Sequence, residues 1–160
     1  MAINVGDKIP ASALAHKTAD GIDQVSTDDL FGGKKVVLFS VPSAFTPTCS
    51  AQHLPGFVQK AAEIKAKGVD TIACMAVNDP FVMEAWGKDQ NVGDDVLMLA
   101  DGSAAFTKEI GMELDLVDRG LGVRSQRFAM IVEDGTVTEI MREEGGAFEN
   151  SSAENVLEHL

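Results

Sequence analysis

A buried strand, a proline-rich loop and an amphipathic helix are predicted by residues 35–68, KVVLFSVPSAFTPTCSAQHLPGFVQKAAEIKAKG. The first of these residues, Lys35–Ser40, are mostly β-branched or apolar, which is typical of a strand covered on both faces. Apolar residues then recur at helical spacing, at Leu54, Phe57, Val58, Ala61 and Ile64. Gly68 follows Lys65 and Lys67 and is suited to end the helix. The segment therefore predicts one helix directly after one buried strand.

Strands and helices also alternate along the rest of the chain. Three more apolar runs predict strands, at Val69–Val77, Val96–Ala100 and Gln126–Glu133. Asp79-Pro80 predicts the start of a helix through Trp86.

The remaining signals are shorter. They are a helix from Ser103 to near Gly111, a hairpin at Asp134-Gly135, and a capping box at Ser151-Ser152-Ala153-Glu154 before a last helix. Together these patterns predict an α/β fold with a mixed sheet flanked by helices, in a single domain over residues 1–160.

Composition and charge exclude several classes of protein. The 160 residues are 45% hydrophobic and 24% charged, which is ordinary for a globular chain and argues against disorder. The longest apolar run, Ile72–Val77, is far shorter than the roughly 18 residues that a membrane span needs. With 25 acidic and 13 basic residues the net charge is −12, which disfavours binding to nucleic acid or to anionic membranes.

The cysteines and the N-terminus indicate a compartment. Cys49 and Cys74 are too few for a secreted disulfide scaffold. Residues 1–7 lack the basic and apolar regions of a signal peptide. We therefore expect a reducing cytoplasm, although a processed organellar protein would have the same composition.

Cys49 is the residue that points most strongly to chemistry. It is expected near the start of the helix that follows the first strand, where unpaired backbone N–H groups and the helix dipole stabilise a thiolate. Pro42 and Pro47 restrict the loop that carries it, and Pro55 predicts an irregular first turn. Loops at this end of an α/β sheet commonly bind ligands. Cys49 is therefore predicted as a reactive thiol, and a small buried hydrophobe is the alternative.

The same loop carries a family resemblance. Pro42, Thr46 and Cys49 match the Pro-x-x-x-Thr-x-x-Cys motif of the peroxiredoxins. The blocks PSAFTPTCSAQHLPGF (42–57), VNDPFVMEAWG (77–87) and GLGVRSQRFA (120–129) resemble the plant type-II and mammalian type-V groups, and the resemblance covers nearly the whole chain. It implies a thioredoxin-like fold and a thiol peroxidase that needs no metal or organic cofactor. The implied substrates are hydrogen peroxide and alkyl hydroperoxides.

The resemblance also implies the roles of four residues. Cys49 would attack the peroxide and become a sulfenic acid, which a thiol then reduces. Thr46 would place its hydroxyl beside the thiolate and the peroxide, Arg127 would orient both and stabilise charge, and Pro42 would shield the sulfenic acid. Ionising the thiol gains only roughly thirty-fold at pH 7, so a fast peroxidase must also stabilise the breaking O–O bond. This need is the physical case for Thr46 and Arg127.

Phe45, His53 and Arg124 are predicted as walls of the pocket. His53 would share a helix face with Cys49, but the cysteines and histidines lack the spacing of a metal site. Arg124 and Arg127 differ by three positions, so on one strand they would point to opposite faces. The resemblance selects Arg127 to face Cys49. Arg124 is left to buttress the site or to pair with an acid such as Glu133 or Asp118.

Cys74 has two interpretations. It lies in the longest apolar run, which predicts a buried strand thiol, whereas the plant type-II resemblance implies that it resolves the sulfenic acid. A disulfide with Cys49 would need Cα atoms within ~7 Å, and we expect local unwinding to be necessary. Mammalian type-V members carry their resolving cysteine near the C-terminus, where this chain has Glu149–Ser152 and no cysteine. We therefore expect an external reductant, either glutathione with glutaredoxin or thioredoxin.

Two hypotheses of different kinds remain, a peroxidase and a regulatory protein that senses peroxide at Cys49 and passes the oxidation to a partner. Multiple turnover with a general thiol system would separate them. A disulfide oxidoreductase is disfavoured, because Thr46 stands where the Cys-x-x-Cys motif has its first thiol. The resemblance further implies a homodimer through the face around the active-site loop. Phe45 and Trp86 are the candidate contacts, and a place in the core is the alternative for each.

Overall fold

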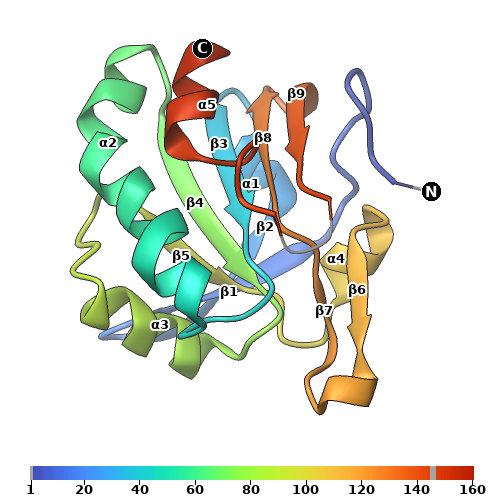
Figure 1. The fold of residues 1–160 in the computed structure, drawn as a ribbon. Coiled ribbons are helices and arrows are strands. Elements are labelled where there is room, and N and C mark those ends of the chain that lie inside the picture. Colours follow the sequence, from blue (N-terminus) through green and yellow to red (C-terminus); the bar gives the residue numbers. More distant parts are fainter. Residues whose placement is uncertain (1, 145–146) are drawn as a thin grey trace.

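The protein alternates strands and helices along most of its length (Figure 1). The computed structural model describes residues 2–144 and 147–160. In chain order the elements are β1 (Ala13–Thr18), β2 (Gly21–Ser26), α1 (Thr27–Phe31), β3 (Lys35–Ser40), the π-helix η1 (Cys49–His53), α2 (Leu54–Ala66), β4 (Thr71–Ala76), α3 (Pro80–Asp89), β5 (Leu97–Ala100), α4 (Ala105–Glu109), β6 (Glu113–Leu116), the 3-10 helix η2 (Val117–Arg119), β7 (Gly122–Ser125), β8 (Phe128–Glu133), β9 (Thr136–Arg142) and α5 (Ala153–Glu158).

A seven-stranded mixed sheet forms the centre of the molecule, in the order β2-β1-β5-β4-β3-β8-β9. The central strands β3, β4 and β5 are parallel, while the flanking pairs are antiparallel. A separate antiparallel pair, β6 and β7, lies beside it (Figure 1). Parallel strands at the centre and helices on both faces give the α/β architecture that the sequence predicts.

The two faces of the sheet pack against different helices. On β3, Val37 and Phe39 join the core that includes residues of α2, α3 and α5, while Val36 and Leu38 join the core that includes residues of α1 and α4. Successive strand residues point to opposite faces, so a strand buried on both sides needs an unbroken apolar run. This requirement explains the composition of Lys35–Ser40, which matches β3 residue for residue.

Most of the predicted elements are confirmed, with corrections at their ends. The helix predicted near Ser103 is α4, but the group that caps it is the carboxylate of Asp101, which accepts from the backbone N–H groups of Phe106 and Thr107. The last helix begins one residue later than a capping box at Ser151 implies. Its N-cap is Ser152, whose hydroxyl accepts from the N–H of Asn155.

Sequence patterns missed the N-terminal hairpin of β1 and β2 and the small β6–β7 pair. The residues of β2 are mostly exposed, and β6 and β7 have four residues each. Exposed strands and strands of four residues show no clear alternation of apolar and polar residues. In the structure β1 pairs with β2 and with β5, and β6 pairs with β7.

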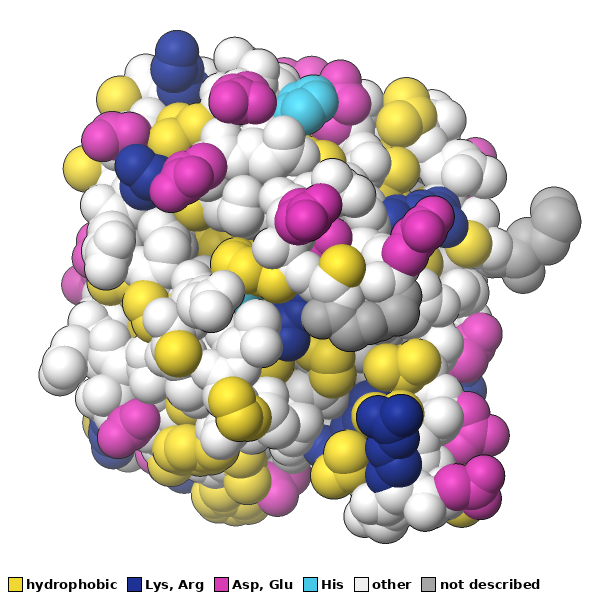
Figure 2. Space-filling view, in the orientation of Figure 1, with side chains coloured by type: hydrophobic (Ala, Val, Ile, Leu, Met, Phe, Trp, Pro, Cys, Tyr) yellow, Lys and Arg dark blue, Asp and Glu magenta, His cyan; other side chains and the backbone are white. Residues whose placement is uncertain are grey.

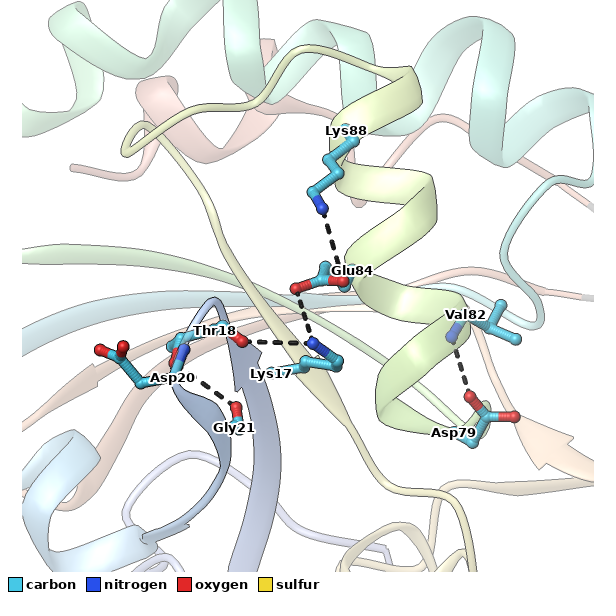
Figure 3. A network of polar contacts seen from close by, with 8 residues as sticks. All are labelled: Lys17, Thr18, Asp20, Gly21, Asp79, Val82, Glu84 and Lys88. Atoms are coloured by element: carbon cyan, nitrogen blue, oxygen red, sulfur yellow. Dashed lines mark hydrogen bonds and ion pairs between the residues drawn. The ribbon is translucent and has the colours of Figure 1, made fainter.

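Helix α3 begins as predicted and is attached to the first strand by charged groups (Figure 3). The Asp79 carboxylate accepts from the N–H of Val82 at 2.8 Å, which satisfies one of the free donors of the first turn. One turn further on, the Glu84 carboxylate lies between Lys17 of β1, at 3.3 Å, and Lys88, at 3.5 Å. The contact between Lys17 and Glu84 joins α3 to β1, and the helix buries Trp86 completely.

Candidate active site

Cys49 lies where the chain enters its first long helix. Helical backbone starts at Pro47, and Cys49–His53 then form a π-turn that leads into α2. Pro55 has no N–H to donate to the carbonyl four residues before it, and the turn ahead of it is widened, so that Leu54 donates to the carbonyl of Cys49. The irregular turn predicted from Pro55 is confirmed. The Cys49 side chain is fully buried.

Arg127 is the charged group nearest to the thiol. Its Nη2 atom lies 3.0 Å from the sulfur of Cys49. Arg127 is itself buried, and among the described residues no carboxylate forms an ion pair with it. A buried cation without an anionic partner is costly, so this guanidinium is available to stabilise negative charge that develops beside the sulfur.

The position of Arg127 depends on where strand β8 begins. The predicted strand starts at Gln126, but the ladder with β3 starts at Phe128. The N–H of Gln126 instead donates to the carbonyl of Met112. Arg127 therefore lies between β7 and β8, and the expectation that Arg124 and Arg127 share one strand with alternating faces is wrong.

His53 holds the other side of the guanidinium. Its Nδ1 atom lies 2.7 Å from Nη1 of Arg127, and its Nε2 atom lies 3.0 Å from the carbonyl oxygen of Ser151. A carbonyl only accepts and a guanidinium only donates, so Nε2 carries the proton and Nδ1 accepts. Burial, together with the charge of Arg127, lowers the pKa of His53 to about 3. His53 is therefore a neutral hydrogen-bond acceptor for Arg127 at physiological pH.

Thr46 and Pro42 lie in the loop between β3 and the helix. The hydroxyl of Thr46 donates to the carbonyl of Ser43 at 2.9 Å, and its backbone carbonyl accepts from Ser50. Since the hydroxyl proton is bonded to the carbonyl of Ser43, the hydroxyl oxygen remains free to accept a hydrogen bond from a ligand. Pro42 is half-buried at the start of the loop.

Arg124 buttresses this loop. Its guanidinium donates to the carbonyl of Val77 at 2.8 Å and lies 3.4 Å from the hydroxyl of Ser43, while its Nε donates to Leu121. In the described part of the chain it pairs with no acid, so the alternative of an ion pair with Glu133 or Asp118 is wrong. Glu133 pairs with Lys35 instead.

Phe45 and Trp86, the two residues expected at an interface, differ in exposure. Phe45 is 53% exposed and adopts a φ of 65°, which is uncommon for a residue with a large side chain. Trp86 is fully buried and donates its indole N–H to the hydroxyl of Ser50 at 3.0 Å. Trp86 is therefore a core residue that supports the π-turn, and it offers no surface to a partner.

Cys74 lies at the centre of β4 and belongs to the same core as Cys49. Its strand pairs with β3 on one side and β5 on the other. Both thiols are free. Burial raises the pKa of Cys74, and the neighbouring Cys49 raises it further, so Cys74 stays protonated at neutral pH.

Three residues of the site were not identified from the sequence. The ring of Phe148 lies 4.9 Å from that of His53 and 5.8 Å from the guanidinium carbon of Arg127. Ser151 provides the carbonyl for His53, and the side chain of Glu143 binds the backbone around Ser151. All three follow the last strand, in a stretch without periodicity, and no local pattern indicates them.

The surrounding surface is partly apolar. Figure 2 shows a hollow in this face of the molecule, with basic side chains inside it and hydrophobic side chains around it. In the parts of the chain that the structure describes, no three His, Cys, Asp or Glu residues are placed to hold a metal ion. No helix among these residues is long and apolar enough to cross a membrane.

Comparison with known proteins places this site in a family. The profile of the Redoxin family matches residues 4–157. Peroxiredoxin-2B of Arabidopsis thaliana is 51% identical over 99% of this chain and 98% of its own length. The chain belongs to the peroxiredoxins. It falls in their plant type-II group and is a thiol-dependent peroxidase with a thioredoxin-like fold.

Other relatives extend the likeness. The chloroplastic peroxiredoxin-2E of Arabidopsis thaliana is 54% identical over 99% of this chain and 69% of its own length. Reduced Prx3 of Vibrio vulnificus, solved in complex with H₂O₂, is 50% identical, covers 98% of each chain and superimposes with a TM-score of 0.95. The fold and the enzyme class predicted from the sequence are confirmed.

Proposed function

We propose that Cys49 is the nucleophile of this peroxidase and that hydrogen peroxide and small alkyl hydroperoxides are its substrates. The observation that carries the proposal is the 3.0 Å contact between Nη2 of Arg127 and the sulfur of Cys49, with no carboxylate paired to Arg127 among the described residues. The thiolate sulfur attacks the terminal oxygen of the peroxide, and the O–O bond breaks. The sulfur becomes a sulfenic acid, and the leaving oxygen takes a proton to give water or an alcohol.

Arg127 and Thr46 act on the oxygen atoms during this step. Negative charge develops on the leaving oxygen as the O–O bond lengthens, and a fixed guanidinium beside the sulfur stabilises that charge. The Thr46 hydroxyl, with its proton bonded to Ser43, accepts a hydrogen bond from the peroxide and orients it. Pro42 limits access of further peroxide to the sulfenic acid from the loop side.

The sulfenic acid is then reduced by thiols from outside the chain. A first thiol displaces water and leaves a mixed disulfide on Cys49, and a second thiol releases the free cysteine and a disulfide product. Cys74 is poorly suited to replace these external thiols, because it is protonated and lies in a strand that pairs on both sides. We propose glutathione with glutaredoxin as the reductant, and thioredoxin as the alternative.

Intact mass measurement tests the nucleophile and the reductant together. Reduced protein, the Cys49→Ser variant and the matched Cys74→Ser variant are each mixed anaerobically with one equivalent of hydrogen peroxide. We expect one added oxygen in the wild type and in Cys74→Ser, and none in Cys49→Ser. Loss of two hydrogens in the wild type would mean that Cys74 resolves the sulfenic acid. Oxygen uptake by Cys49→Ser would refute Cys49 as the nucleophile.

Turnover distinguishes the enzyme from a sensor. With glutathione and glutaredoxin in excess, Cys74→Ser should reduce many equivalents of peroxide at the wild-type rate. If it consumes one equivalent and stops while the wild type continues, the external-thiol cycle is wrong.

We also propose a homodimer through the face that carries Phe45. Phe81, at the start of α3, is 59% exposed. Three residues earlier, the side chain of Asn78 accepts from the N–H of Ala44, the neighbour of Phe45, at 3.0 Å. The two exposed phenylalanines therefore lie on neighbouring segments, and exposed apolar groups of this kind favour an interface. Sedimentation velocity of Phe81→Asp, with Ile22→Asp of β2 as control, tests this. A dimer that survives Phe81→Asp would place the interface elsewhere.

We propose that the protein works in a reducing compartment, and that this compartment is the cytoplasm. Both cysteines are free thiols, which a reducing environment maintains. Peroxiredoxin-2E, one of the relatives, is named as chloroplastic. Fractionation of the source cells with an antibody to the protein tests the compartment, and enrichment in an organelle would refute the cytoplasmic assignment.

A further inference from the structure

Glu143 is a buried carboxylate that the steps proposed above do not use. It follows β9, and its backbone N–H donates to the carbonyl of Arg127 at 3.3 Å. Its side chain accepts from the N–H groups of Glu149 (2.8 Å), Asn150 (3.1 Å) and Ser151 (2.8 Å), and from the Ser151 hydroxyl (2.7 Å). Four donors around one buried carboxylate hold residues 149–151 in a fixed turn.

That turn presents the Ser151 carbonyl to the active site. The carbonyl accepts from Nε2 of His53 at 3.0 Å and so fixes the ring proton on Nε2. Nδ1 is then free to accept from Nη1 of Arg127 at 2.7 Å, and Nη2 of the same guanidinium reaches the Cys49 sulfur at 3.0 Å. A continuous series of hydrogen bonds therefore joins Glu143 to Cys49.

We propose that Glu143 is a positioning residue of the peroxidase: its carboxylate holds the Ser151 carbonyl in place, which fixes the His53 tautomer and aims Arg127 at the Cys49 sulfur. The inference rests on the proposed role of Cys49. It assigns a function to a residue that touches neither the peroxide nor the thiol.

The chemistry of the donors explains why a carboxylate is needed here. Both oxygens of Glu143 accept, Oε2 from Glu149 and from the N–H and hydroxyl of Ser151, and Oε1 from Asn150. A glutamine has nearly the same shape but only one acceptor oxygen. Even with that oxygen in the place of Oε2, its NH₂ group would face the N–H of Asn150, and the loss of charge would weaken the other three bonds, so the turn would loosen. The adjacent Glu144 is exposed, and its side chain is a matched control for charge and sequence position.

The test compares Glu143→Gln with Glu144→Gln in three measurements. The first is the rate constant of the reaction with hydrogen peroxide. It should fall roughly ten-fold in Glu143→Gln only, because Arg127 is no longer held in place beside the sulfur. The second is the pH at which that rate constant reaches half of its plateau value, which should shift in Glu143→Gln only. The third is ¹⁵N NMR of the His53 ring, where the single Nε2–H tautomer should become a mixture.

A purely structural role would lower the folded fraction without changing the pH midpoint or the tautomer of the folded molecules. Rates, midpoints and tautomers in Glu143→Gln that match those of Glu144→Gln would therefore overturn the inference. If Glu143→Gln does not fold, Glu143→Asp keeps the charge but withdraws it by one methylene. It should show the same shifts in smaller size, and wild-type values in Glu143→Asp would also overturn the inference.

The outcome is separable from that of the proposed function. If Cys49→Ser keeps peroxidase activity, the proposed role of Cys49 is wrong, and the positioning role of Glu143 is wrong with it. If Cys49→Ser is inactive and Glu143→Gln is unaffected, only the positioning role fails.

Discussion

His53 should make the stability of this protein unusually sensitive to mild acid. The folded protein holds the ring neutral, with a pKa of about 3, because the ring is buried and lies beside Arg127. In the unfolded chain the same imidazole titrates near 6.5. Between these two values the unfolded state binds a proton that the folded state does not. Acidification through this window therefore favours unfolding.

The size of the effect follows from the two pKa values. Well below pH 6.5, each pH unit costs about 1.4 kcal/mol of the free energy of unfolding, and from pH 7.5 to 5.0 the loss is about 2 kcal/mol. Hydrogen bonds to the Ser151 backbone and the other donors lower the pKa of Glu143 against the opposing effect of burial. The stabilising contribution of the Glu143 carboxylate is therefore lost only at lower pH. Above pH 5.0 the change in the free energy of unfolding comes mainly from His53.

Urea unfolding followed by the fluorescence of Trp86 measures this loss, because Trp86 is the single tryptophan and is fully buried. The His53→Gln variant should be less stable at pH 7.5 but should lose its dependence on pH between 7.5 and 5.0. His159→Gln, at an exposed position near the C-terminus, is the matched control and should keep the wild-type slope. A wild-type loss below about 0.5 kcal/mol, or parallel slopes in wild type and His53→Gln, would refute the reasoning.

Three shorter predictions test other contacts. Arg127→Lys keeps the charge, but a lysine cannot contact His53 and Cys49 at once, so the rate constant with hydrogen peroxide should fall by a factor of about 10²–10³. Stopped-flow kinetics measure it, and a rate constant within about five-fold of wild type would contradict the prediction. Asp79→Ala removes the cap of α3 and should cost about 1 kcal/mol in urea unfolding, whereas Asp20→Ala at an exposed turn should cost little; equal losses would argue against the cap. Ser50→Ala leaves the buried indole N–H of Trp86 without its acceptor and should cost about 1–3 kcal/mol, and an unchanged midpoint would show that the hydrogen bond is dispensable.

The central strands and the helices beside them were predictable because their signals are local. A strand buried on both faces needs a continuous apolar run, and β3 and β4 have one. Two residues are enough to predict the helix start at Asp79-Pro80 and the turn at Asp134-Gly135. Both lie where they were predicted. The hairpin of β1 and β2 has no comparable signal, since its exposed residues are held by pairing with each other and with β5.

The sequence by itself determined the fold class and the reactive thiol, because a strand, a proline-bounded loop and a helix start are adjacent in the chain. It determined the enzyme family through the resemblance of the Pro-x-x-x-Thr-x-x-Cys motif and its flanking blocks to the peroxiredoxins. Only the tertiary structure decided what surrounds the thiol. Arg127 reaches Cys49 because β8 begins at Phe128. His53 is neutral because it is buried beside a guanidinium, and the distant Ser151 carbonyl and Arg127 together fix its tautomer. Glu143 lies far from Cys49 in the chain and acts through side chains that meet only after folding. Hydrogen bonds between such distant residues depend on where whole elements end, and no local pattern of residues encodes those ends.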